Sequence, residues 1–60
     1  MSELEKLGVL RKKLVNRRRF MVGILQDAPD DHFTADTFTR IQHAIEAVDR
    51  AIADEQKPSR

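Results

Sequence analysis

The residues that could do chemistry in this chain are concentrated in one basic stretch, Arg11-Lys12-Lys13 followed by Arg17-Arg18-Arg19-Phe20. Lysine and arginine side chains bind phosphate, and an exposed aromatic ring can stack on a base, so this combination suits nucleic acid. The alternatives are an acidic protein, a membrane surface, or a solvated basic face, and no recognised nucleic-acid-binding motif accompanies the stretch. On a helix the outward-facing members form a candidate face for a polyanion or a partner: Val9, Lys12, Lys13, Asn16, Arg17, Arg19 and Phe20.

Metal binding and catalysis have little support in the sequence. His43 and Glu46 have the spacing of a helical metal-binding pair, but a second such pair to face it is absent. The aspartates at 27, 30, 31 and 36 lack the glycine and the spacing of a calcium loop. There is no cysteine or tyrosine, and no recognised catalytic motif is present. We therefore expect no enzyme, no metal and no other cofactor.

Charge is divided unevenly between the two halves of the chain. Residues 1–27 carry seven Lys and Arg against three acidic residues, whereas residues 28–60 carry four against seven. Opposed net charges favour antiparallel pairing of the halves. The acidic start without an apolar run predicts no secretory signal, and no apolar run is long enough to span a membrane. We therefore expect a cytoplasmic protein.

Two helices that position these residues follow from local signals. Ser2 and Glu5 form a capping box that predicts a helix over about residues 3–27. Pro29 then interrupts the pattern, which predicts a loop over about 28–34. Thr34 as N-cap, with the staple spacing of Phe33 and Phe38, predicts a second helix over about 35–56, although Asp30 or Asp31 could open it a turn earlier. We expect an all-α antiparallel helical hairpin over 1–57 and a disordered tail over 58–60.

The apolar pattern differs between the two predicted helices. The second helix has one narrow stripe at alternating spacings of three and four, whereas apolar residues cover about half the circumference of the first. A face that broad should contact two helices, and a chain of 60 residues buries little surface alone. We therefore predict a homodimer, two hairpins forming a four-helix bundle, with docking on another protein as the alternative. The predicted seam comprises Leu7, Leu10, Leu14, Met21, Leu25, Phe38, Ile41, Ile45, Val48 and Ile52.

Arg11 and Arg18 interrupt the apolar face of the first helix, one heptad apart. One interpretation is that their stems pack while their heads reach water or pair with acids such as Asp49 or Glu55. The other is that they select one arrangement of the bundle over others.

Two functions remain after these exclusions. The first is a small non-enzymatic protein that dimerises and presents a surface to a protein partner. The alternative is a regulator that binds RNA or DNA through the basic face of the first helix, chiefly Lys12, Lys13, Arg17 and Arg19.

Overall fold

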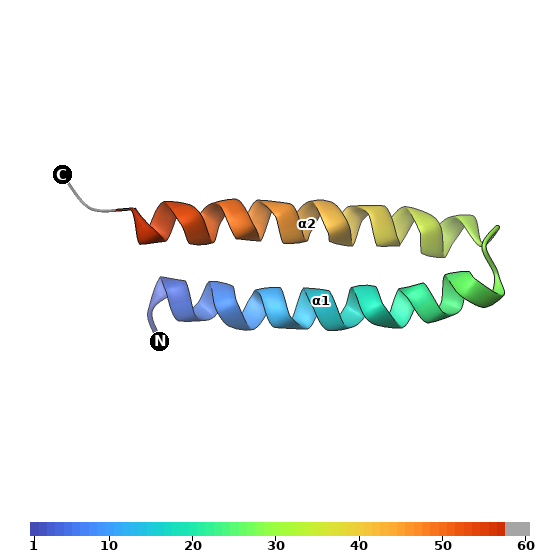
Figure 1. The fold of residues 1–60 in the computed structure, drawn as a ribbon, viewed down its shortest axis with the longest axis horizontal. Helices are drawn as coiled ribbons and strands as arrows, with labels where there is room; N and C mark the ends of the chain where they lie inside the picture. The colour runs from blue at the N-terminus through green and yellow to red at the C-terminus, as the bar shows by residue number, and fades with distance from the viewer. Residues whose placement is uncertain (58–60) are drawn as a thin grey trace.

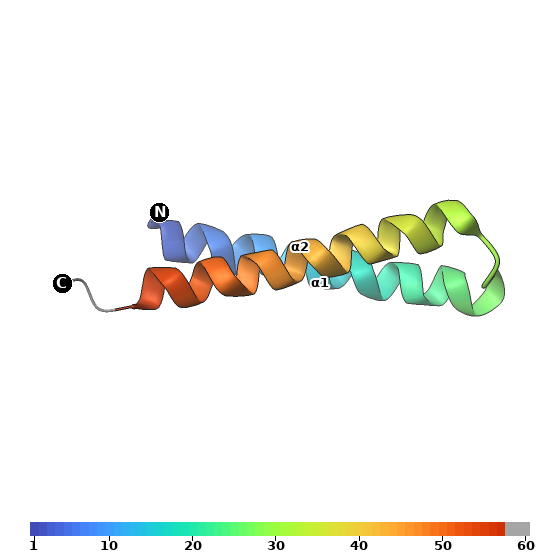
Figure 2. The ribbon, with the colours of Figure 1, turned by 90° about the horizontal axis from the view of Figure 1, so that it is seen from above.

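The computed structural model describes residues 1–57 as two antiparallel helices, α1 (Glu3–Asp27) and α2 (His32–Gln56). Figure 1 shows them side by side along their whole length, joined by the short loop at one end, with the N-terminus and the end of α2 at the other. Seen from above, they cross at a shallow angle (Figure 2). The all-α hairpin is therefore confirmed. The tail predicted over 58–60 lies outside the described residues.

The start of α1 follows the prediction. The Ser2 hydroxyl accepts a hydrogen bond from the Glu5 backbone N–H at 3.1 Å, and the Glu5 carboxylate accepts one from the Ser2 backbone N–H at 3.0 Å. These bonds stabilise the charged carboxylate and lower the pKa of Glu5. At the other end the Ala28 N–H donates to the Ile24 carbonyl at 2.9 Å, and Pro29 follows. Both ends of α1 are thus set by residues within the local sequence.

The start of α2 differs from the predicted Thr34 N-cap, which is wrong. Asp31 is the N-cap, one of the two alternative starts, and its carboxylate accepts the Thr34 backbone N–H at 3.1 Å and the Thr34 hydroxyl at 2.7 Å. The same bonds lower the pKa of Asp31. Thr34 is buried and satisfies its hydroxyl on the cap. Phe33 falls inside the first turn of α2, so the predicted hydrophobic staple does not form and the Phe33 ring is 82% exposed.

The core is a small cluster between the helices. Met21 of α1 packs with Ile41 and Ile45 of α2, and Leu14, Val15 and Phe38 close around them. Ile45 is the most enclosed of the buried apolar side chains, at 2% exposed. Of the predicted seam, four residues are buried in the single hairpin: Met21, Ile41, Ile45 and Val48. Leu7, Leu14, Leu25, Phe38 and Ile52 are half-buried, and Leu10 is exposed.

The hairpin is a rod with a large surface for its mass. Its extents are 49 × 18 × 13 Å, and its radius of gyration is 14.3 Å, against about 10 Å for a compact domain of this length. The accessible surface is 4909 Å², whereas a folded monomer of this mass exposes about 4,000 Å². One layer of contact between two helices therefore leaves much apolar surface in water.

Candidate functional site

Two polar contacts join α1 to α2 on one side of the hairpin. The Arg11 guanidinium donates to the two carboxylate oxygens of Asp49 at 2.5 and 3.4 Å, a pairing that the sequence suggested. The pair raises the pKa of Arg11 and lowers that of Asp49. One heptad along each helix, Arg18 donates to the Gln42 side-chain oxygen at 2.7 Å. Both arginine heads are therefore satisfied within a single chain.

These contacts continue outward along α2. The Gln42 side-chain amide donates to Glu46 at 3.1 Å, so the Arg18 contact extends into a short chain of polar groups. We call this side of the molecule the polar flank, defined by Arg11, Arg18, Gln42, Glu46 and Asp49. Val22 lies four residues after Arg18 and therefore shares its side of α1. The polar flank has its hydrogen-bonding groups already engaged within the chain.

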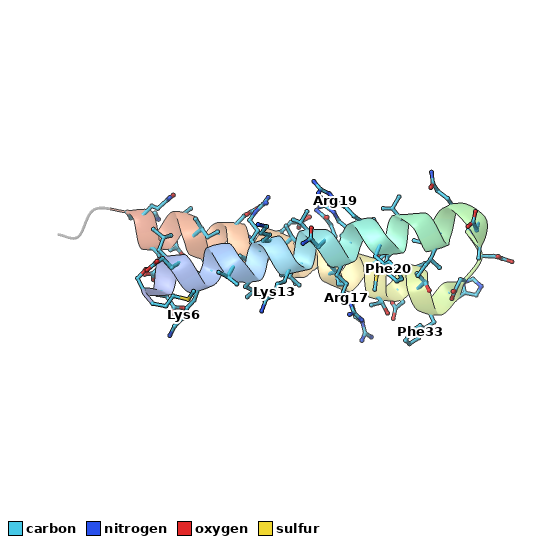
Figure 3. The ribbon with its side chains drawn as sticks, turned by 90° about the horizontal axis from the view of Figure 1, so that it is seen from below. Lys6, Lys13, Arg17, Arg19, Phe20 and Phe33 are labelled. Carbon is cyan, nitrogen blue, oxygen red and sulfur yellow. The ribbon has the colours of Figure 1, made fainter. Side chains whose placement is uncertain are left out.

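The opposite side of the hairpin is lined mainly by small and apolar side chains, with Arg17 among them. Ala44 precedes the buried Ile45 and Glu46 follows it, so Ala44 lies on the side of α2 away from the polar flank. On α1, Arg17 and Arg19 flank Arg18 in the same way, and Figure 3 shows them pointing to opposite sides. Phe33 points to the side of Arg17.

Helical spacing identifies the other residues that lie on this side of α1 and α2. Leu10, Arg17 and Ile24 form a heptad row on α1, and Phe33, Thr37, Ala44 and Ala51 form a row on α2. We call the strip between the two rows the apolar flank, defined by Leu10, Ile24, Thr37, Ala44 and Ala51. Leu10 is 44% exposed there, and the other four are half-buried.

The predicted basic face extends over the outer half of α1, with its cations toward two opposite edges. Arg19, and Lys12 one heptad before it, lie on one side of the outer half of α1, whereas Lys13 and Arg17 lie on the other (Figure 3). By helical spacing, Asn16 and Val9 fall between the two groups. Val9 and Phe20 are exposed, as predicted. The seven candidate residues therefore span the outer half of the helix, with cations at both edges of it.

The side of the hairpin that carries Lys13 and Arg17 has two further residues that the sequence analysis did not include. Lys6, Lys13 and Phe20 are each one heptad apart, and Arg17 lies four residues after Lys13. Figure 3 shows Lys6, Lys13, Arg17 and Phe33 on the same side of the molecule. We call this set, Lys6, Lys13, Arg17, Phe20 and Phe33, the basic-aromatic row. Lys6 was missed although the heptad spacing pointed to it, and Phe33 was missed because it was assigned to a staple.

The basic charges of this row are not neutralised by the acidic half of the chain. Within residues 1–57, the Arg11–Asp49 pair is the one salt bridge between the helices, and the other two join neighbouring residues near or within α2. None of these salt bridges involves Lys6, Lys13 or Arg17. Opposed charge between the halves therefore accounts for one ion pair, and these three cations keep their charges available.

Other features of the surface do not assemble a site. A depression near the start of α2 is lined by His32, Phe33, Ala35, Asp36 and Thr39, and it lies open on one helix. Among residues 1–57, no three His, Asp or Glu side chains are grouped as metal ligands, and every buried side-chain nitrogen or oxygen has a hydrogen-bond partner. Within the same span, neither helix has the length and apolar character needed to cross a membrane.

Comparison with known proteins does not add to what these surfaces indicate about function. No protein-family model, curated protein or solved structure matches this chain. The two flanks and the basic-aromatic row are therefore the features of this chain that bear on its function.

Proposed function

We propose that this protein is a non-enzymatic interaction module that works as a homodimer, in which a second copy covers the apolar flank. The observation that carries the proposal is the incomplete burial of the apolar flank, where Leu10 is exposed and Ile24 and Ala44 are half-buried, in a hairpin whose own core is one small cluster. Face-to-face packing of two hairpins is the four-helix bundle, which buries a strip of this kind on each copy. Presenting a surface to a further protein partner is then the function of the assembled bundle.

The accessible surface of the hairpin exceeds that of a compact monomer by about the area that one partner would cover. The hairpin exposes 4909 Å², about 900 Å² more than a folded monomer of its mass. A standard stable interface removes about 800 Å² from each partner. One additional helical hairpin lying along the strip therefore accounts for the surplus.

The chain is also complementary to itself. α1 is basic overall and α2 is acidic overall, so packing α1 against α2 of a second copy brings opposite charges together on both sides of a two-fold axis. Ala44 and Ala51 are small, and they allow the backbone of a second helix to approach closely. A self-complementary surface with both signs favours a second copy over an unrelated protein.

The test compares two exposed apolar residues on the two flanks of α1. Leu10 and Val22 are both 44% exposed, but Leu10 belongs to the apolar flank and Val22 lies beside the polar flank. We expect Leu10→Asp to convert the dimer to a monomer and Val22→Asp to leave it dimeric. Sedimentation velocity between about 5 and 200 µM measures the mass, and circular dichroism confirms that both variants stay helical.

Two results would overturn the proposal. One is a wild-type protein that sediments as a monomer over the whole range and melts cooperatively at a temperature independent of concentration. The other is dissociation by Val22→Asp to the same extent as by Leu10→Asp, which would move the interface away from the apolar flank.

A further inference from the structure

The geometry points to single-stranded nucleic acid as the ligand of the basic-aromatic row. This binding function goes beyond dimerisation and does not depend on it. Lys6, Lys13 and Arg17 supply cations, and two exposed rings, Phe20 at 71% and Phe33 at 82%, lie on the same side of the hairpin. Non-specific single-strand sites combine these two parts, a cationic track for the phosphates and aromatic rings on which bases stack.

The dimensions of the row fit a short segment of a strand. Lys6 and Phe20 are 14 residues apart on one straight helix, so they span about 21 Å. At about 3.4 Å per nucleotide along a stacked strand, that length corresponds to about six nucleotides. The three cations lie along this line and Phe20 ends it, while Phe33 lies on the same side of the hairpin in the first turn of α2, so one strand that follows α1 toward the loop can reach both rings.

The cations and the rings of the row are both available to bind a ligand. The three cations take no part in the salt bridges found within residues 1–57, so binding phosphate breaks no existing ion pair. The rings contribute little to the core cluster, which is built from other residues. An unpaired base offers a flat surface to each ring, whereas bases in a duplex are stacked on one another and covered. Single strands are therefore favoured over duplexes.

The row and the apolar flank are adjacent and share residues at their border. Lys13 and Phe20 lie further round α1 than Leu10, whereas Arg17 and Phe33 lie in the two rows that bound the apolar flank, and Lys6 has the helical position of Ile24. A second copy on the apolar flank therefore leaves Lys13 and Phe20 open, doubles them by symmetry, and lies beside the other three residues. Because mass and oligonucleotide binding are measured separately, failure of one proposal leaves the other testable.

The experiment measures fluorescence anisotropy of a labelled 12-nucleotide oligouridine with the full-length protein. Three phosphate contacts on a single strand predict a slope of about −2 in log K against log salt. Affinity should therefore fall about 20-fold between 50 and 200 mM salt. In Lys13→Gln/Arg17→Gln one cation remains, and we expect weaker binding and only about a threefold fall over the same range.

The matched control removes the same charge from the other side of α1. Lys12→Gln/Arg19→Gln should keep a salt dependence close to that of the wild type, because neither residue belongs to the row. Equal losses in the two double variants would overturn the inference, since they would show that overall charge alone draws the oligonucleotide.

The rings are tested separately from the charges. Phe20→Ala should weaken binding about 5- to 150-fold without changing the salt slope, because stacking releases no counterions. Phe20 is exposed, so helicity and mass should stay as in the wild type. Three results would contradict the inference: unchanged affinity in Phe20→Ala, no oligouridine binding at 50 mM salt and micromolar protein, or binding only to vesicles containing phosphatidylserine.

Discussion

The two helices of this hairpin have the same length but bury their apolar residues to very different extents. α2 buries Ile41, Ile45 and Val48, which form one narrow stripe directed at α1. α1 buries Met21 alone and leaves five apolar side chains exposed: Leu4, Val9, Leu10, Phe20 and Val22. Apart from the exposed Phe33, the large apolar side chains of α2 are matched to one neighbour, whereas those of α1 exceed what one neighbour can cover.

This difference separates residues that hold the hairpin together from residues that are available for binding. A side chain enclosed by its own chain contributes to folding, and its loss leaves a cavity. A half-exposed side chain contributes little until another molecule covers it. The inner stripe of α2 therefore holds the hairpin together, and we infer that the part of α1 left uncovered by α2 is available to a partner.

The largest expected effect is on stability, and it distinguishes residues that hold the hairpin together from residues available for binding. Ile45→Ala removes the most enclosed apolar side chain, at 2% exposed, and should lower the free energy of unfolding by about 2–5 kcal/mol. Leu10→Ala should change the stability of the monomer by less than about 1 kcal/mol. Thermal melts followed by circular dichroism at low protein concentration measure both.

The control for Ile45→Ala and Leu10→Ala is to repeat the melts at high protein concentration. At high concentration Leu10→Ala should lower the melting temperature relative to wild type, because stabilisation by a partner depends on mass action. If the two variants were equally destabilised at every concentration, the distinction between a structural stripe and an interacting surface would be wrong.

A smaller effect is expected at the start of α2, whose first turn depends on one carboxylate. Asp31→Ala removes the cap and leaves the hydroxyl of Thr34, which is 8% exposed, without its partner. An unpaired buried hydroxyl costs about 1–3 kcal/mol. Asp30→Ala, next to it and exposed, is the matched control. A melting temperature lowered equally by both would exclude the capping role of Asp31.

The same carboxylate predicts a dependence on pH. The pKa of Asp31 is lowered from its ordinary value of 3.8 by its hydrogen bonds to Thr34, so the folded state binds protons less readily than the unfolded state. Its contribution to stability is therefore present above about pH 4 and is lost as the pH falls through the lowered pKa. In Asp31→Ala the melting temperature should fall less steeply over that acidic range than in the wild type.

The smallest effect concerns the two glycines of α1. A methyl group added at Gly8 or Gly23 meets no atom within 4 Å, so each Gly→Ala substitution should raise stability by up to about 1 kcal/mol through helix propensity. Both glycines lie away from the apolar flank, so the mass of the assembly should not change. Loss of the dimer in either variant would show that a partner approaches α1 on that side.

The sequence predicted the fold more completely than the surfaces. The capping box at Ser2 and the break before Pro29 are local signals, and both helices and their antiparallel pairing followed from them and from the apolar stripes. The start of α2 was misassigned because Asp31 and Thr34 are both good caps, and the burial of Thr34 is a tertiary property that the local sequence does not specify. The role of the basic face stays a prediction, because a helical wheel shows which side chains share a face and not what binds to that face.

The short loop and the position of the core near it determine the order in which the hairpin should form. The cluster around Met21 and Ile41 closes a short stretch of chain, whereas Arg11 and Asp49 are 38 residues apart. Because the entropy lost on closing a loop grows with its length, assembly should start at the loop end and proceed toward the termini. Opening should follow the reverse order, so backbone amides near both free ends should exchange with solvent deuterium before those around the cluster.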